Sequence, residues 1–246
     1  MRTRLEAPRW PARLDLLQSG TGVALGLFMW VHMFFVSSIL LGRDVMWTVA
    51  RFFEGYFFFG RPLPWLVSLL VAMVFALFIG HAALALRKFP ASYKQYSRLH
   101  EHVGAISHQD TTLWYVQVIT GFALFFLVPV HLYGVMTQPE NIGPYASSDR
   151  IWSGRFWILY APLLVTVHLH AAIGFYRLAM KWGLPTTGDA VRMRRRFKVL
   201  MWVILLAFLA LGTASLATYM TIGYEHADRA GERYLPPPHT ASGEGG

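Results

Sequence analysis

Five long apolar segments dominate this sequence and restrict it to membrane architectures. They cover roughly residues 17–41, 65–87, 112–136, 155–181 and 197–222. A helix needs about 20 apolar residues to cross a hydrocarbon core of about 30 Å, and each segment reaches that length. We therefore predict an all-α membrane protein with five transmembrane helices, forming a single domain over residues 1–246. The polar end of the chain, residues 225–246, is predicted to be a flexible tail.

The charge distribution predicts the orientation of the chain. Of its 22 Lys and Arg residues, 15 fall in the N-terminal tail and in the loops after the second and fourth segments. Basic loops stay in the cytoplasm, so we expect a cytoplasmic N-terminus in a multi-pass protein. The same rule explains the net charge of +9 without nucleic acid as a partner. We expect the basic run 192–198 to contact lipid headgroups or an acidic partner protein, and the aromatic loop 42–64 to form a helix at the interface.

Histidines within the apolar segments are the main candidates for function. They are His32, His81, His131, His168 and His170. An imidazole in the membrane is costly unless it has a polar or metal partner. Packing explains one such histidine, but four of the five segments each carry at least one. The chain has no Cys, which excludes an iron–sulfur cluster held by this chain and covalent haem attachment.

Depth in the membrane sorts these histidines into two pairs. A bis-histidine haem needs two imidazoles at similar depth on facing helices. At about 1.5 Å per residue, His81 and His170 lie about 9 and 16 Å from the cytoplasmic end of their segments. His32 and His131 lie about 22 and 28 Å from that end. We therefore predict two haem b groups in a bundle of four helices. The inner haem would be held by His81 and His170, and the outer one by His32 and His131. Residue spacing alone does not decide between His168 and His170.

Haem propionates are anionic and need hydrogen-bond donors near the membrane surfaces. Gln18, Ser19, Trp114 and Lys181 lie at the inner ends of their segments, and Arg150 lies near the outer surface. We predict that these five residues contact propionates. The alternative for intramembrane histidines is a zinc or proton transporter. Such a site would gather histidines and carboxylates at one depth, which the sequence does not favour.

Several motifs resemble those of a known family. They are QSGTGVALGLFMWVHMFFVS, GHAALALRKFP, DTTLWYVQVITGFALFFLVPVHL and HLHAAIGFYRLAMKWG. The chain resembles the dihaem cytochrome b subunit of quinol:fumarate reductases and related succinate:menaquinone reductases, from about Leu14 to Tyr224. The resemblance implies the same two histidine pairs, with His170 rather than His168 as the ligand on the fourth helix.

The resemblance also implies a function. The subunit would oxidise menaquinol and pass electrons through two haems to iron–sulfur and flavoprotein partners on the cytoplasmic face, or run in reverse from succinate. It would lie in a bacterial inner membrane, with a dimer of heterotrimers as the assembly. Glu54, in RFFEGYFF, matches a glutamate implicated in menaquinol oxidation, and a carboxylate at the membrane edge is suited to accepting protons. The alternative is a cytochrome b anchor of a hydrogenase or formate dehydrogenase.

The sequence departs from this family at one position. The family pattern V-E-L-H places a glutamate, assigned to a proton path, two residues before the haem ligand. This chain reads V-H-L-H, with His168 in place of the glutamate. We expect that path to be absent or to use His168, because an imidazole can also relay protons.

Overall fold

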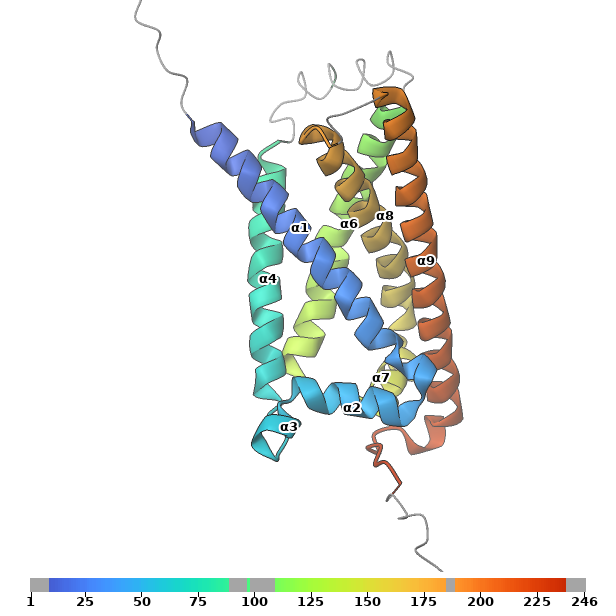
Figure 1. Ribbon diagram of the computed structural model, residues 1–246. Helices are drawn as coiled ribbons and strands as arrows, with labels where there is room; N and C mark the ends of the chain where they lie inside the picture. The colour runs from blue at the N-terminus through green and yellow to red at the C-terminus, as the bar shows by residue number, and fades with distance from the viewer. Residues whose placement is uncertain (1–8, 89–96, 98–108, 185–188, 238–246) are drawn as a thin grey trace, which may run out of the picture.

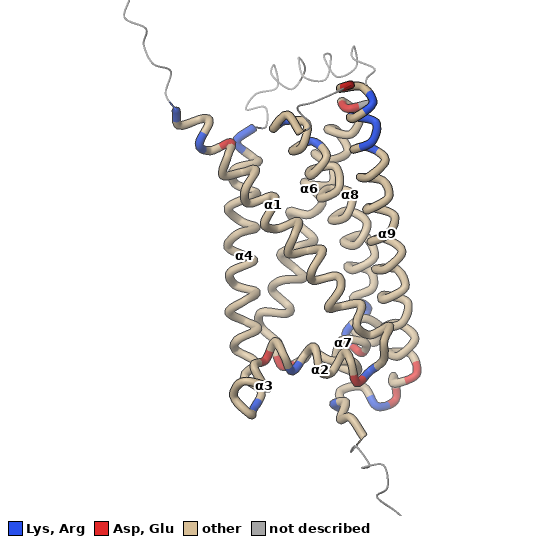
Figure 2. The backbone as a smooth tube through the Cα atoms, viewed as in Figure 1, with Lys and Arg blue, Asp and Glu red and all other residues tan. Residues whose placement is uncertain are grey.

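The computed structural model describes residues 9–88, 97, 109–184 and 189–237. Within these ranges, five helices are long and apolar enough to cross a membrane, which confirms the predicted all-α membrane fold. They are α1 (Trp10–Ser37), α4 (Trp65–Leu86), α6 (Gln109–Thr137), α8 (Trp157–Lys181) and α9 (Ala190–Glu225). The first and last described residues lie at opposite ends of the bundle (Figure 1). Charged residues gather at both ends and are rare between them (Figure 2).

Two helices extend well beyond the apolar segments that predicted them. α1 begins at Trp10 rather than near residue 17, and α9 begins at Ala190 rather than near residue 197. Pro11 lies in the first turn of α1, where its missing N–H costs nothing. The Asp189 side chain accepts hydrogen bonds from the backbone N–H groups of Val191 and Arg192 at 3.0 and 3.2 Å. A proline in the first turn of α1 and the Asp189 cap of α9 therefore allow both helices to begin in polar sequence before their apolar segments.

Four of the long helices, α1, α4, α6 and α8, surround a central cavity, and α9 packs against α8. α1 crosses the bundle diagonally, starting beside α4 and ending near α9 (Figure 1). α8 packs between α6 and α9. The α8–α9 contact is made by a buried cluster of small and large apolar residues: Ala172, Ile173, Tyr176, Met201 and Leu205. Close packing of this kind holds helices together in lipid, where burial of apolar surface alone gives little advantage.

Short helices close one end of the bundle, the outer end according to the charge pattern. α2 (Arg43–Phe53) lies across the ends of the long helices, in agreement with the interfacial helix expected there (Figure 1). α3 (Tyr56–Phe59) and α7 (Pro144–Ile151) lie at the same end. Gly55 adopts the left-handed conformation with φ +74°, which lets the chain turn sharply directly after Glu54.

The start of the predicted flexible tail is tied to this end. The His226 ring is buried, stacks on Tyr145 with centroids 4.0 Å apart, and places Nδ1 3.0 Å from Asp149 Oδ1. The Gly231 N–H donates to Asp149 Oδ2 at 2.9 Å. The Tyr234 hydroxyl donates to Asp44 Oδ1 at 2.5 Å, and burial together with this bond raises the pKa of Tyr234 to about 12. Residues 238–246 lie outside the described part of the chain.

Candidate functional site

A large cavity extends through the bundle between α1, α4, α6 and α8. Its volume is about 1270 Å³. This exceeds the roughly 300–1,000 Å³ typical of a pocket for one small molecule. All four predicted haem ligands line it: His32, His81, His131 and His170. The five predicted propionate contacts also line it: Gln18, Ser19, Trp114, Arg150 and Lys181. The fold therefore brings these nine predicted residues to one cavity.

The outer histidine pair has the spacing of two ligands of one metal ion. The ring centroids of His32 and His131 lie 6.3 Å apart, with a 52° angle between the ring planes. Two imidazoles on opposite sides of one ion, each bound through a nitrogen at about 2 Å, have centroids about 6 Å apart. Nδ1 of His131 is buried and has no hydrogen-bond partner in the described chain. Phe28 stacks on His32 at 5.7 Å, and Tyr160 meets His131 edge-on at 5.4 Å. This pair fits haem ligation.

The inner histidines are oriented by hydrogen bonds from neighbouring helices. Nδ1 of His170 lies 3.0 Å from the carbonyl oxygen of Gln117 and 3.4 Å from the Thr120 hydroxyl. Nδ1 of His81 lies 3.1 Å from the Thr21 hydroxyl. Histidine ligands commonly use one ring nitrogen for such a bond and the other for the metal. These contacts therefore leave Nε2 of each ring as the ligand atom.

Two glycines give the inner histidine rings room against adjacent helices. A Cβ atom at Gly121 of α6 would lie 2.8 Å from Cε1 of His170. A Cβ atom at Gly22 of α1 would lie 3.0 Å from Cε1 of His81. Each ring therefore rests on bare backbone. Sequence reasoning missed both positions, although a glycine inside a helical apolar segment often marks close packing.

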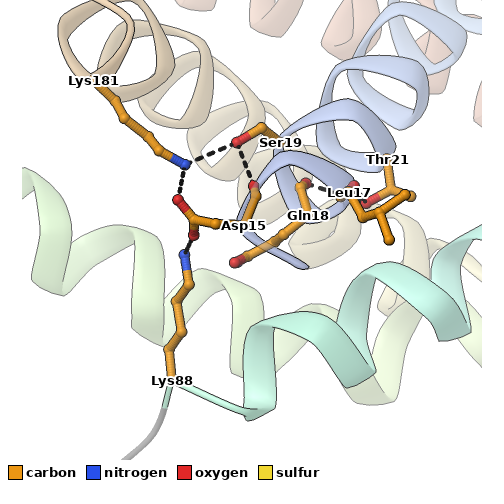
Figure 3. A network of polar contacts seen from close by, with 7 residues as sticks. All are labelled: Asp15, Leu17, Gln18, Ser19, Thr21, Lys88 and Lys181. Atoms are coloured by element: carbon orange, nitrogen blue, oxygen red, sulfur yellow. Dashed lines mark hydrogen bonds and ion pairs between the residues drawn. The ribbon is translucent and has the colours of Figure 1, made fainter. Parts of the chain in front are cut away.

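A polar network lies at the inner end of the cavity, where Ser19, Lys88 and Lys181 line the wall. Figure 3 shows the side chains of this network. Asp15 of α1 forms ion pairs with Lys88 and Lys181. The Lys181 ammonium donates to the Ser19 hydroxyl at 3.1 Å, and that hydroxyl donates to the Asp15 carbonyl oxygen at 2.9 Å. The Gln18 side-chain oxygen is buried and has no partner among the described residues. Ser19 and Lys181 therefore belong to one network, with Gln18 beside it (Figure 3).

The charges at this end match an anionic group. Lys88, Arg177 and Lys181 all line the cavity. Asp15 compensates the two lysines only in part, and Arg177 donates to the amide oxygen of Gln117, a neutral partner. The inner end therefore carries excess positive charge, which suits carboxylates such as haem propionates. Sequence reasoning counted Arg177 only as a loop cation and did not single out Asp15.

Arg150 occupies the corresponding position near the outer histidine pair. Its guanidinium donates to the carbonyl oxygen of Asn141 at 2.5 Å and also interacts with the Tyr160 hydroxyl. The Tyr160 ring in turn contacts His131. Arg150 is therefore a cation on the cavity wall that is connected to His131 through Tyr160. A propionate of a haem held by the outer pair would need a cation at such a position.

His168 faces a different helix from His170. Its ring is 1% exposed and stacks on Phe208 of α9, with centroids 5.7 Å apart. Its Nδ1 lies 2.7 Å from the carbonyl oxygen of Leu164, one turn earlier on α8. His170 instead contacts α6 through Gln117. Both histidines line the cavity, and Nε2 of His168 has no partner among the described residues, so the contact with α6 is what distinguishes His170 as the candidate ligand.

Glu54 is a buried residue at the end of α2. Its side chain is 1% exposed and lies 2.7 Å from the Arg51 guanidinium in an ion pair. Burial raises the pKa of Glu54, although the positive charges of Arg51 and Arg233 act in the opposite direction. Glu54 does not contribute to the cavity wall, but Ala50 and Phe53 of the same helix do. The structure therefore places the predicted proton acceptor beside the outer end of the cavity.

In the described residues, no group of three or more His, Cys, Asp or Glu side chains could hold a metal ion. The histidines instead occur as pairs across a large apolar cavity. Paired histidines across an apolar cavity are the arrangement that a bis-histidine haem requires.

Comparison with known proteins finds related membrane subunits. Residues 93–211 match the family described as Succinate dehydrogenase/Fumarate reductase transmembrane subunit. The fumarate reductase cytochrome b subunit of Wolinella succinogenes is 49% identical over 220 residues, covering 89% of this chain and 86% of that subunit. The subunit of the same name from Helicobacter pylori strain J99 is 45% identical over 217 residues, covering 88% of this chain and 84% of that subunit. The chain therefore belongs to the family of fumarate reductase cytochrome b subunits, transmembrane proteins of electron transport.

Proposed function

We propose that this chain binds two haem b groups and oxidises menaquinol for a fumarate reductase complex. Membership of a cytochrome b family implies haem. The observation that carries the proposal is the outer pair, His32 and His131, whose ring centroids are 6.3 Å apart in the cavity. A second pair on the same cavity, with both Nδ1 atoms hydrogen-bonded, supports a second haem.

Each haem would be held by one histidine pair and one group of donors. His81 and His170 would bind the inner haem, with Gln18, Ser19, Trp114 and Lys181 at its propionates. His32 and His131 would bind the outer haem, with Arg150 near its propionates. Haem iron between two imidazoles supplies reversible one-electron transfer. The protein fixes the imidazoles, excludes water with an apolar wall and balances the propionate charge.

We place menaquinol oxidation at the outer end, beside α2. Oxidation releases two protons along with two electrons, so a proton acceptor is needed. Glu54 is suited to this role because its raised pKa brings a carboxylate closer to neutral pH, where it exchanges protons efficiently. Ala50 and Phe53 connect the helix that carries Glu54 to the cavity wall. The outer aqueous phase would receive the protons.

The inner end would face the cytoplasm and the partner subunits. The start of α1 and the basic start of α9 lie at this end (Figure 2), and basic residues favour the cytoplasmic side. An iron–sulfur subunit would accept electrons here and pass them to a flavoprotein that reduces fumarate. The same residues would serve the reverse direction, from succinate to menaquinone. The assembly would be a dimer of heterotrimers in a bacterial inner membrane.

Purification of the native complex tests this proposal. We expect two haem b per chain by pyridine haemochrome assay, together with flavoprotein and iron–sulfur partners. One haem per chain would contradict the two-pair arrangement. A nickel or molybdenum partner would instead favour the hydrogenase or formate dehydrogenase alternative.

Substitution of the four ligands tests the pairing. His32→Ala and His131→Ala should remove the same haem, and His81→Ala and His170→Ala should remove the other. Redox titration distinguishes the two haems by their potentials. Loss of different haems from two members of one pair would contradict the assignment.

A further inference from the structure

The basic start of α9 has two different faces. On one face, Arg194 and Lys198 form ion pairs with Asp110 of α6 at 3.3 and 2.7 Å. Met201 and Leu205 continue this face and are buried in the bundle. These two cations therefore fasten α9 to its neighbour and are used within the fold.

The other cations of this segment point away from the bundle. Arg192, Arg195 and Arg196 are exposed, and together with Val199, Leu200 and Val203 they line a groove, here called the arginine groove. Positions 192, 196, 199 and 203 are spaced by three or four residues, so they share one helix face. The apolar members are more than half exposed. In a membrane protein, exposed valine and leucine side chains of a membrane-spanning helix face lipid tails.

The length of α9 places these arginines at the headgroups. Its 36 residues span about 54 Å, compared with about 30 Å for the hydrocarbon core. The helix therefore extends beyond the hydrocarbon core. Its first turns carry the arginines, and the next turns carry the exposed apolar stripe formed by Val199, Leu200 and Val203. Figure 2 shows this basic segment at the end of α9, level with the start of α1.

These arginines have unused capacity for an anion. Arg192 has one carboxylate nearby, Asp189 at 3.8 Å, and both side chains are more than half exposed. Among the described residues, the ion pairs of this segment involve Arg192, Arg194 and Lys198, and none involves Arg195 or Arg196. A guanidinium binds phosphate with two parallel hydrogen bonds, so three of them on one face form a strong phosphate-binding surface.

We propose that the arginine groove binds an anionic phospholipid. The phosphate is held by Arg192, Arg195 and Arg196, and an acyl chain lies along Val199, Leu200 and Val203. A phospholipid fits better than free phosphate because the basic surface continues into an exposed apolar stripe. It fits better than an acidic protein because that stripe lies within the lipid-facing part of α9, which a soluble partner does not reach.

The test measures lipid bound to the purified complex. The variant Arg192→Gln/Arg195→Gln/Arg196→Gln is compared with Arg9→Gln/Arg13→Gln/Arg87→Gln, which removes the same charge from exposed sites at the same membrane end. Complexes are placed in nanodiscs of phosphatidylcholine with increasing phosphatidylglycerol, and bound lipid is counted by native mass spectrometry. We expect the groove variant to lose at least about tenfold in affinity for phosphatidylglycerol, since it loses the bidentate guanidinium–phosphate hydrogen bonds as well as the general attraction between surface cations and anionic lipid. The control should change much less.

Further variants separate the possible occupants. Val199→Ser/Val203→Ser should weaken phosphatidylglycerol binding while leaving the three arginines in place. Arg192→Lys/Arg195→Lys/Arg196→Lys keeps the charge and the fold but lacks the bidentate geometry, so its affinity should be intermediate. Equal affinity in the groove variant and the control would overturn the proposal. Full displacement of the lipid by millimolar inorganic phosphate, or loss of a partner subunit without loss of lipid, would also overturn it.

Discussion

Arg51 and Glu54 form an ion pair of 2.7 Å at the end of α2, where the Glu54 side chain is 1% exposed and the Arg51 side chain 16% exposed. The Arg51 guanidinium also lies 5.9 Å from the centre of the Trp47 ring. The pair therefore sits in an aromatic, largely dry environment, where a nearby charge acts strongly on a carboxyl group. Arg51 was not among the predicted site residues, because an arginine in an interfacial loop is common.

Arg51→Gln is expected to shift the pH dependence of quinol oxidation. Burial raises the pKa of Glu54 and Arg51 opposes that effect, so the substitution should raise the pKa further. Only the ionised carboxylate accepts a proton, so activity should fall at higher pH than in the native protein as the solution is acidified. The acidic limb should move up by about one pH unit. The rate of quinol-dependent fumarate reduction across pH measures this shift.

Two further variants control this experiment. Arg51→Lys keeps the positive charge and should retain most of the native profile. Arg61→Gln removes an exposed charge from the same loop and should leave the profile unchanged. A profile for Arg51→Gln that superimposes on the native one would show that Arg51 does not act on the proton acceptor.

Gly121→Ala is expected to disturb the inner haem site. The added Cβ would lie 2.8 Å from the His170 ring, and that ring is held in place by Gln117. Overpacking of this kind costs about 1–3 kcal/mol. We expect lower haem content or an altered spectrum for one haem only. Haem assay and low-temperature absorption spectra measure both effects.

A matched control exists on the same helix. Gly134→Ala also adds a methyl group to α6, but nothing lies within 4 Å of that position. It should keep full haem content and even favour the helix slightly. Equal behaviour of the two alanine variants would contradict the close packing at His170.

The sequence was informative where the membrane imposes a simple rule. Apolar segments have a fixed minimum length, so the five spans could be predicted, and helix rise alone paired the histidines by depth. The ends of α1 and α9 could not be predicted in this way. Hydrophobicity marks the part of a helix that lies in lipid, whereas Asp189 and its hydrogen bonds determine where α9 begins.

Contacts between distant segments explain what the sequence did not reveal. Gly22 and Gly121 matter only because α4 and α8 bring His81 and His170 against them. The tail carries the composition of a flexible segment, yet Asp149, far away in the sequence, accepts its hydrogen bonds. Such relationships follow from the arrangement of helices and have no local sequence signal.

Asp149→Asn is expected to loosen the start of the tail. The carboxylate lies 3.0 Å from His226 Nδ1 and accepts from the Gly231 N–H at 2.9 Å. A hydrogen bond to a charged group contributes about 1.5–3 kcal/mol, so local opening should increase about tenfold or more. Trypsin cleavage after Arg229 and Arg233 reports this opening. Asp228→Asn is the control, since Asp228 is exposed and lies in the short helix Ala227–Arg229 at the start of the tail. Equal cleavage of both variants would contradict the tether.

His168→Gln is expected to keep both haems, whereas His170→Gln should lose one. The His168 ring stacks on Phe208 of α9 and is bonded to its own helix at Leu164, so it is directed away from α6. Glutamine is similar in size and keeps a donor for the Leu164 carbonyl, so the buried site should remain filled. His170 has Nδ1 fixed by Gln117, and its other nitrogen is left for iron.

Haem counting and redox titration of both variants decide the ligand on α8. The native protein and His168→Gln should each give two haem b per chain with two resolved potentials. His170→Gln should give one haem, with the potential of the outer site retained. Loss of a haem from His168→Gln together with two haems in His170→Gln would reverse the assignment. It would mean that α8 turns in the assembled complex, because residues two apart point about 200° apart on a helix and cannot both face one haem.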